Sequence, residues 1–216
     1  MENWAKELAS LGFSEHTYSE TIVVSQGPAG LTAAPMGILL SGENLLIQPY
    51  RDTRTYANLV SSKNCTINIT HSSLLFYKAV MKSFSRRSFA KSKVVDAPRL
   101  RGVDAVVEAT LLSVVEDLGD RAKLLLKPAY LKVFRRKPKT YNRADSLLIE
   151  ALVYYTKIQP YMKMGKTLEV KKFIEGIEHC CKTLHNVSTD VMLKKAASQT
   201  LRKSKEYLRV CESSFA

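Results

Sequence analysis

The period of the hydrophobic pattern changes once along this chain, near residue 140, and that change constrains the fold more than any other feature. Before it, short β-branched or alternating segments are separated by glycine, proline and asparagine turns. After it, apolar residues recur every three or four positions, which is the pattern of amphipathic helices. The sequence therefore predicts an α+β protein that is mainly β. A mostly antiparallel barrel domain is expected over residues 1–140, and a small helical bundle over residues 141–216.

The expected elements follow from this pattern and from the turns between them. Strands are predicted at residues 21–25, 31–40, 45–48, 65–70, 103–118 and 121–134. Helices are predicted at residues 1–12, 51–62, 72–82, 142–158, 167–185 and 188–211. Residues 83–101 are rich in lysine and arginine and predict a long basic loop. Pro128 predicts an edge, a bulge or a bend in its strand, and Pro160 is expected to break the helix that begins at Asn142.

The charge is large and unevenly distributed. The 216 residues include 33 Lys and Arg against 20 Asp and Glu, a formal net charge of +13. The first 60 residues are nevertheless acidic, so the whole positive excess lies in the later part of the chain. Such an asymmetry suggests nucleic acid or another polyanion as a partner, and the alternative is a solvated basic surface. Few aromatic residues alternate with the basic runs, which disfavours nucleic acid as the partner.

Several other classes of protein are disfavoured by what the sequence lacks. No apolar stretch approaches the length of a transmembrane helix, and the first residues lack the pattern of a signal peptide, so we expect a cytoplasmic protein. Nucleotide-binding glycine motifs, zinc-protease motifs and nucleophile elbows are absent, which argues against a hydrolase with its own catalytic side chains. Cys181 and His185 could share a metal on a helix, but Cys181 continues a buried apolar stripe. We therefore expect no metal site.

One short segment has the composition of a phosphate site. Arg51, Thr53, Arg54 and Thr55 lie at the predicted start of a helix. A phosphate monoester is bound by guanidinium groups, short hydroxyl donors and the free N–H groups of a helix N-terminus. The alternative is a threonine N-cap with two exposed arginines.

A second segment, residues 32–37, is unusual for a strand. Pro35 removes a ladder hydrogen bond, its neighbours are small, and Gly37 permits the close approach of a ligand or another backbone. Such an interrupted strand, with a soft Met36, can form a shallow wall for a flat heterocycle. The alternative is a β-bulge at a barrel corner.

Residues 18–82, with SETIVVS, TAAPMGILL, PYRDTRTYANL and CTINITHSSLLFYKAVMK, resemble the family called domain of unknown function 447. That family belongs with the flavin-reductase-like, FMN-binding split barrels. Residues 127–128, 141–144 and 149–153 extend the resemblance to about residue 158 and into the helical tail. The turn at residues 27–32 departs from the family's usual Asp-Gly-x-Pro-Asn, which affects the contact expected of Thr32.

The resemblance implies a homodimer of split barrels that binds FMN near the subunit interface. Thr53 and Thr55, with Arg51 or Arg54, would hold the phosphate. Backbone groups would line the isoalloxazine ring of FMN. Four further polar residues are candidates for the same site because of their positions in the family pattern. The lining residues are Ala34, Pro35, Met36 and Gly37, and the polar candidates are Tyr50, Asn58, Asn68 and Asn142.

Three functions remain open at the level of sequence. The first is an FMN-dependent oxidoreductase with an unknown substrate, in which the flavin supplies the chemistry and no catalytic side chain is assigned. The second is a non-catalytic FMN carrier or sensor. The third is a basic nucleic-acid-binding protein that uses residues 82–101, residues 132–143 and the lysines of the last helix.

Overall fold

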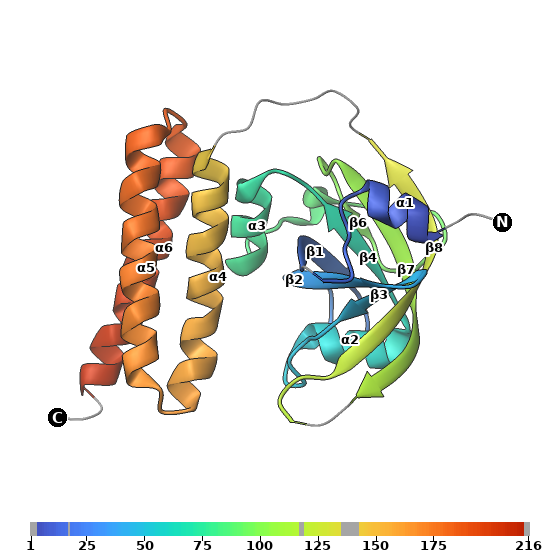
Figure 1. The fold of residues 1–216 in the computed structure, drawn as a ribbon, viewed down its shortest axis with the longest axis horizontal. Helices are drawn as coiled ribbons and strands as arrows, with labels where there is room; N and C mark the ends of the chain where they lie inside the picture. The colour runs from blue at the N-terminus through green and yellow to red at the C-terminus, as the bar shows by residue number, and fades with distance from the viewer. Residues whose placement is uncertain (1–3, 17, 117–118, 135–142, 214–216) are drawn as a thin grey trace. The chain divides into compact units, whose positions relative to one another are not determined.

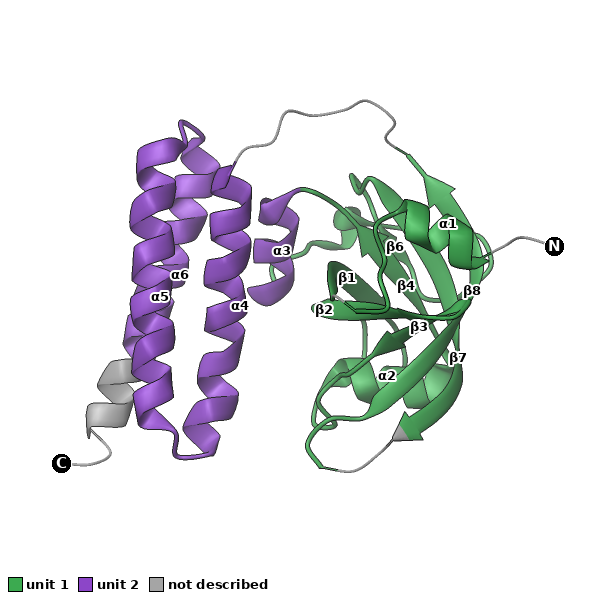
Figure 2. Ribbon diagram, in the orientation of Figure 1, with its two compact units in different colours: residues 1–71, 82–137 green, residues 72–81, 138–216 purple. Residues whose placement is uncertain are grey.

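A computed structural model of the chain describes residues 4–16, 18–116, 119–134 and 143–213. The chain divides into two compact units (Figure 2). Unit 1 comprises Met1–His71 and Lys82–Lys137, and unit 2 comprises Ser72–Met81 and Pro138–Ala216. A short segment from the middle of the chain therefore belongs with the C-terminal helices.

Unit 1 is built on a closed six-stranded barrel in which all neighbouring strands are antiparallel (Figure 1). Its strand order is β1-β2-β3-β8-β7-β4. The strands are β1 (Ser19–Ser25), β2 (Thr32–Ser41), β3 (Asn44–Ile47), β4 (Asn64–Ile69), β7 (Ala105–Glu116) and β8 (Lys123–Val133). The predicted fold class, a mainly β barrel followed by helices, is confirmed. The bulge expected near Pro128 is present as a register shift where Ala109 pairs with Pro128.

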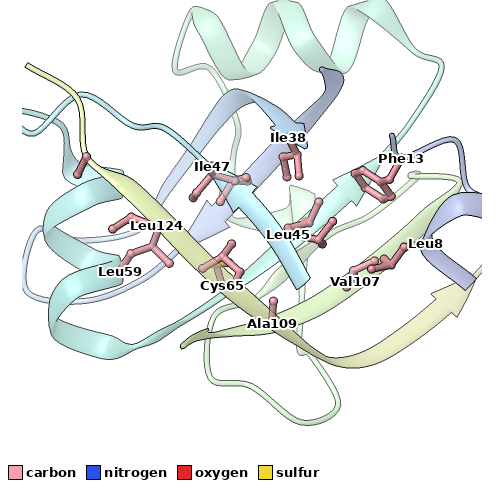
Figure 3. Packing of buried hydrophobic residues seen from close by; sticks show 14 residues of the cluster. Leu8, Phe13, Ile38, Leu45, Ile47, Leu59, Cys65, Val107, Ala109 and Leu124 are labelled. Carbon is pink, nitrogen blue, oxygen red and sulfur yellow. The ribbon is translucent and has the colours of Figure 1, made fainter. Parts of the chain in front are cut away.

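The core of the barrel is a cluster of buried, mostly aliphatic side chains (Figure 3). Alternate residues point inward from each strand, such as Leu45 and Ile47 of β3. Leu8 of α1 (Trp4–Ser10) and Leu59 of α2 (Arg54–Ser62) join the cluster from opposite sides. Burial raises the pKa of the Cys65 thiol to about 12, so this cysteine stays neutral and acts as a core residue.

Residues 83–101 were expected to form a loop, and the prediction misses the short regular elements within it. The segment contains a short 3-10 helix, Arg86–Ser88, and a two-stranded sheet of β5 (Phe89–Ala90) with β6 (Arg99–Leu100). Side chains of β4 hold it, because Thr66 donates to the Pro98 carbonyl and Asn68 accepts from the Leu100 N–H. Strands of two residues are too short to leave an alternating pattern in the sequence.

The described residues of unit 2 form four helices: α3 (Ser73–Val80), α4 (Arg143–Lys163), α5 (Thr167–Val187) and α6 (Val191–Ser213). The Ser73 hydroxyl donates to the Asp145 carboxylate at 2.5 Å, which ties α3 to α4. The predicted break at Pro160 is not observed. Pro160 lies in the last turn of α4, where a missing N–H costs one hydrogen bond, and the helix ends before Gly165 at φ 70°.

The apolar stripe predicted for α5 is confirmed, since Val170, Ile174, Ile177, Cys181 and Leu184 are buried. The Cys181 thiol lies 3.3 Å from the Ala197 carbonyl of α6, and burial raises its pKa to about 12. Among the helices that the structure describes, none is both long and apolar enough to cross a membrane.

Candidate functional site

The first half of β2 pairs with a strand on one edge only. It pairs with β1 in unbroken register from Thr32 to Ile38, whereas its pairing with β3 begins at Ile38. Pro35 therefore lies opposite Ile22 without a bulge. A strand with one open edge tolerates a proline, because half of its N–H groups have no ladder partner.

Residues 32–37 of this half-strand are all partly exposed. The Met36 side chain is partly buried and packs against the barrel core. A Cβ at Gly37 would lie 3.1 Å from the Tyr18 ring, so what approaches this glycine closely is an aromatic side chain. Tyr18 is 53% exposed, and no sequence motif had indicated it as a neighbour of β2.

The helix α2, which packs against β1 and β2, has two first-turn N–H donors, those of Arg54 and Thr55, for which a helix offers no internal acceptor. Thr53 is the N-cap, and its hydroxyl accepts from the Tyr56 N–H at 3.3 Å and donates to the Tyr50 carbonyl at 2.6 Å. The backbone N–H groups of Arg54 and Thr55 lie in the first turn, where an α-helix has no internal acceptor for them, so they point out of the helix end. The positive end of the helix dipole adds to their affinity for an anion. The sequence left open a phosphate site or a simple threonine N-cap. The N-cap is present, and it binds the Tyr56 N–H, not the N–H groups of Arg54 and Thr55.

Two arginines of this segment differ in their surroundings. Arg51 is partly buried. Its backbone N–H donates to the Asp120 carbonyl at 3.0 Å, which ties the segment before α2 to the β7–β8 hairpin. Arg54 is exposed on the first turn of the helix. Thr55, one position further, is only 2% exposed.

Arg121, at the end of the same hairpin, adds a third guanidinium that sequence reasoning did not identify. It stacks 4.0 Å above the ring of Tyr50, and its Nη2 donates to the Tyr50 hydroxyl at 2.7 Å. A β-bridge between Tyr50 and Arg121 fixes this arrangement. The only local signal was a basic residue after a Gly-Asp turn, which does not reveal the distant partner.

The predicted polar candidates Asn58 and Asn68 are fully buried, and their side-chain amides bind the chain itself. The Asn58 amide donates to the Gly30 carbonyl at 2.6 Å and accepts from the Ala29 N–H at 3.2 Å, so it fastens the β1–β2 turn to α2. Asn68 donates to the Ile22 carbonyl and accepts from the Leu100 N–H. In this structure Asn58 and Asn68 therefore bind the chain itself and not a ligand.

Most of the predicted residues lie in unit 1, on β2, on α2 and on the segment before α2. The helix α2 packs against β1 and β2, and we call the half-strand together with the helix N-terminus the α2 site. Asn142, the remaining candidate, lies outside the described residues. The residues of the α2 site are Ala34, Pro35, Met36, Gly37, Tyr50, Arg51, Thr53, Arg54, Thr55 and Arg121.

Comparisons with known proteins agree with the resemblance inferred from the residues. Residues 19–134 match the model of the family described as "Protein of unknown function (DUF447) N-terminal domain". The uncharacterized protein MJ1453 of Methanocaldococcus jannaschii is 22% identical over 190 residues, which is 82% of this chain and 96% of that protein.

Solved structures share the fold. The FMN-bound protein MM1853 of Methanosarcina mazei, assigned to DUF447, superposes with a TM-score of 0.75 at 22% identity, over 91% of this chain and 99% of that one. The flavin reductase HpaC, crystallised with NADP+, matches 62% of this chain and 89% of its own with a TM-score of 0.50 at 18% identity. At these identities the likeness concerns the fold alone.

Proposed function

Since a family model covers more than half of its length, the chain belongs to the DUF447 family, and we propose that it is an FMN-binding flavoprotein. One observation supports this proposal above the others. A helix whose N-terminus carries two threonines and two arginines packs on β1 and β2, and the first half of β2 is a strand of small residues paired on one edge. The first part suits a phosphate monoester and the second a flat ring, and FMN carries both groups.

The residues present fit the group. The α2 N–H groups and Arg51 or Arg54 would hold the phosphate, and Arg121 adds positive charge from the hairpin. Thr53 and Thr55 would contribute by shaping the start of the helix, because the Thr53 hydroxyl donates to the Tyr50 carbonyl and Thr55 is buried. The backbone of residues 34–37 would lie along the isoalloxazine ring. The FMN-bound family member MM1853 shares the fold over nearly its whole chain, which supports the choice of FMN among flavins.

We further propose that the protein is an oxidoreductase that acts as a homodimer with the flavin near the interface. Bound FMN supplies hydride or electron transfer. The chain then has to bind the phosphate, orient the ring and shape access to it, which needs no nucleophilic side chain. A carrier or sensor that binds FMN without turnover is the alternative.

Binding of FMN and of riboflavin tests the phosphate assignment, because the two differ only in the phosphate. We expect the native protein to bind FMN at least about tenfold more tightly than riboflavin, as loss of a charge-assisted contact predicts. The double variant Thr53→Ala/Thr55→Ala should lose that preference, whereas Thr110→Ala, an exposed threonine of β7, should keep it. Equal binding of the two flavins by the native protein would refute the assignment.

The reaction of the bound flavin separates the enzyme from the carrier. An oxidoreductase should lose its visible flavin absorbance when NADH or NADPH is added without oxygen, and should regain it when oxygen returns. A carrier should show neither change with either nucleotide. The measurement is an anaerobic spectrum of the FMN-loaded protein.

A further inference from the structure

Unit 1 contains a second cluster of positive charge, away from the α2 site. A cavity of about 190 Å³ lies beneath residues 91–99 on the outer face of β7 and β8. None of the residues of the α2 site lines it. Its walls carry four cations and two aromatic rings: Lys91, Lys93, Arg99 and Lys132, with Tyr130 and Phe134. We call this region the basic cavity.

The wall formed by residues 91–99 is fixed by a buried carboxylate. Glu108 of β7 is 1% exposed and accepts from the N–H groups of Lys93 and Val94, each at 2.7 Å, and of Val95 at 3.2 Å. Its negative charge is therefore engaged by backbone donors. The lysine and arginine side chains are thus held around the cavity by a segment that is already ordered.

The cations of the cavity lie against rings. The Lys93 ammonium is 4.7 Å from the centre of the Tyr130 ring, and the Arg99 guanidinium is 4.7 Å from that of Phe134. Within the part of the chain that the structure describes, neither cation forms an ion pair with a carboxylate. Phe134 is 42% exposed. Cations without counter-charges beside partly exposed aromatic rings suit a ligand that is both anionic and aromatic.

We propose that the basic cavity binds single-stranded nucleic acid. Backbone phosphates would meet Lys91, Lys93, Arg99 and Lys132, and one or two bases would stack on Tyr130 and Phe134. Stacking on these rings requires unpaired bases, which a duplex does not offer.

Two observations favour a polymer over a small phosphorylated molecule. The cavity is smaller than the roughly 300–1,000 Å³ of sites that enclose a small ligand. It therefore suits one nucleotide of a polymer better than a whole small molecule. Positive charge also continues beyond the cavity, because residues 82–101 contain seven lysines and arginines and one acidic residue, Asp96. A single phosphate would leave most of that charge unused, whereas a strand would follow it.

The first test measures binding of a fluorescent single-stranded oligouridylate of about 12 nucleotides to the full chain by anisotropy. With four phosphate contacts, the logarithm of the affinity should fall with the logarithm of the salt concentration with a slope of about −3. The variant Lys93→Gln/Arg99→Gln should bind at least about tenfold more weakly, and its slope should be smaller by about 1.4. The control Lys171→Gln/Lys172→Gln, two exposed lysines of α5, removes the same charge elsewhere.

The second test removes the rings and keeps the charge. Phe134→Leu and Tyr130→Leu should each weaken binding about tenfold without changing the salt slope. Thermal unfolding and FMN titration of every variant distinguish loss of the cavity from loss of the fold or of the flavin site. An equal effect of the α5 control, unaltered affinity of both ring variants, equal affinity for a duplex, or displacement by pyrophosphate at constant ionic strength would each overturn the proposal.

Discussion

The α2 site and the basic cavity are both rich in positive charge, yet different donors accompany that charge. At the α2 site the arginines stand beside the N–H groups of a helix end capped by Thr53, which together suit one phosphate. At the basic cavity the cations stand over aromatic rings. The α2 site lies mostly in the acidic first 60 residues, so net charge is a poor guide to where an anion binds.

Each region also depends on one buried polar anchor, and the anchors differ in kind. Asn58 is a neutral amide that fastens the β1–β2 turn to α2, whereas Glu108 is a carboxylate that fastens residues 93–95 to β7. Removing one anchor at a time should therefore disturb the two regions separately.

The largest effect is expected for Asn58→Ala. It leaves the Gly30 carbonyl and the Ala29 N–H without their partner inside the protein, and we expect a loss of about 3 kcal/mol in the free energy of unfolding. FMN affinity should fall with it, because the turn leads directly into β2. Urea unfolding and FMN titration measure the two quantities.

Asn186→Ala, on an exposed position of α5, is the matched control and should change stability by less than about 0.5 kcal/mol. A loss below about 1 kcal/mol in Asn58→Ala would show that water replaces the amide readily. Asn58 would then not be an anchor comparable to Glu108, because the β1–β2 turn would keep its structure without the Asn58 amide.

Glu108→Gln should have the next largest effect. The amide keeps the shape of the side chain but weakens the charge-assisted bonds and turns an N–H donor toward backbone donors, so we expect a loss of about 2 kcal/mol. Hydrogen exchange of the amides at residues 93–95 should become faster while FMN affinity stays the same. Mass spectrometry of the corresponding peptides measures the exchange.

The control for charge is Glu43→Gln in the exposed β2–β3 turn, which should leave stability and exchange unaltered. Slow exchange at residues 93–95 in Glu108→Gln would mean that β4 holds the segment without the carboxylate. Thr66 and Asn68, which also bond to it, would then be its main supports.

The sequence was sufficient for most of the barrel, because β1, β2 and β4 each carry β-branched or alternating residues between clear turns. It was not sufficient for β5 and β6, because a strand of two residues shows no alternation of apolar and polar residues. It also did not predict where α4 ends. Pro160 is compatible with a last helical turn, and only the packed helix shows where that turn ends.

The α2 site was predictable in part for a similar reason. Thr53, Thr55 and their arginines are neighbours in sequence, so their chemistry is visible locally. The roles of Asn58, Arg121 and Glu108 depend on partners brought close by strand register, and sequence cannot distinguish an amide that faces a ligand from one that fastens a turn. The rings beneath Lys93 and Arg99 escaped notice because they come from β8 and its end.

The smallest expected effect is the change in FMN affinity with salt concentration. Measured beside the change in oligonucleotide affinity, it compares the two regions directly. A single phosphate held by helix N–H groups and one or two arginines should lose only about two- to fourfold in affinity between about 50 and 200 mM salt. An oligonucleotide on the basic cavity should lose about fiftyfold over the same range. Paired titrations of one protein preparation, at matched pH and temperature, give both slopes. If FMN binding were as steep as that of the oligonucleotide, diffuse charge would hold both ligands, and the short donors at the start of α2 would not define a site of their own.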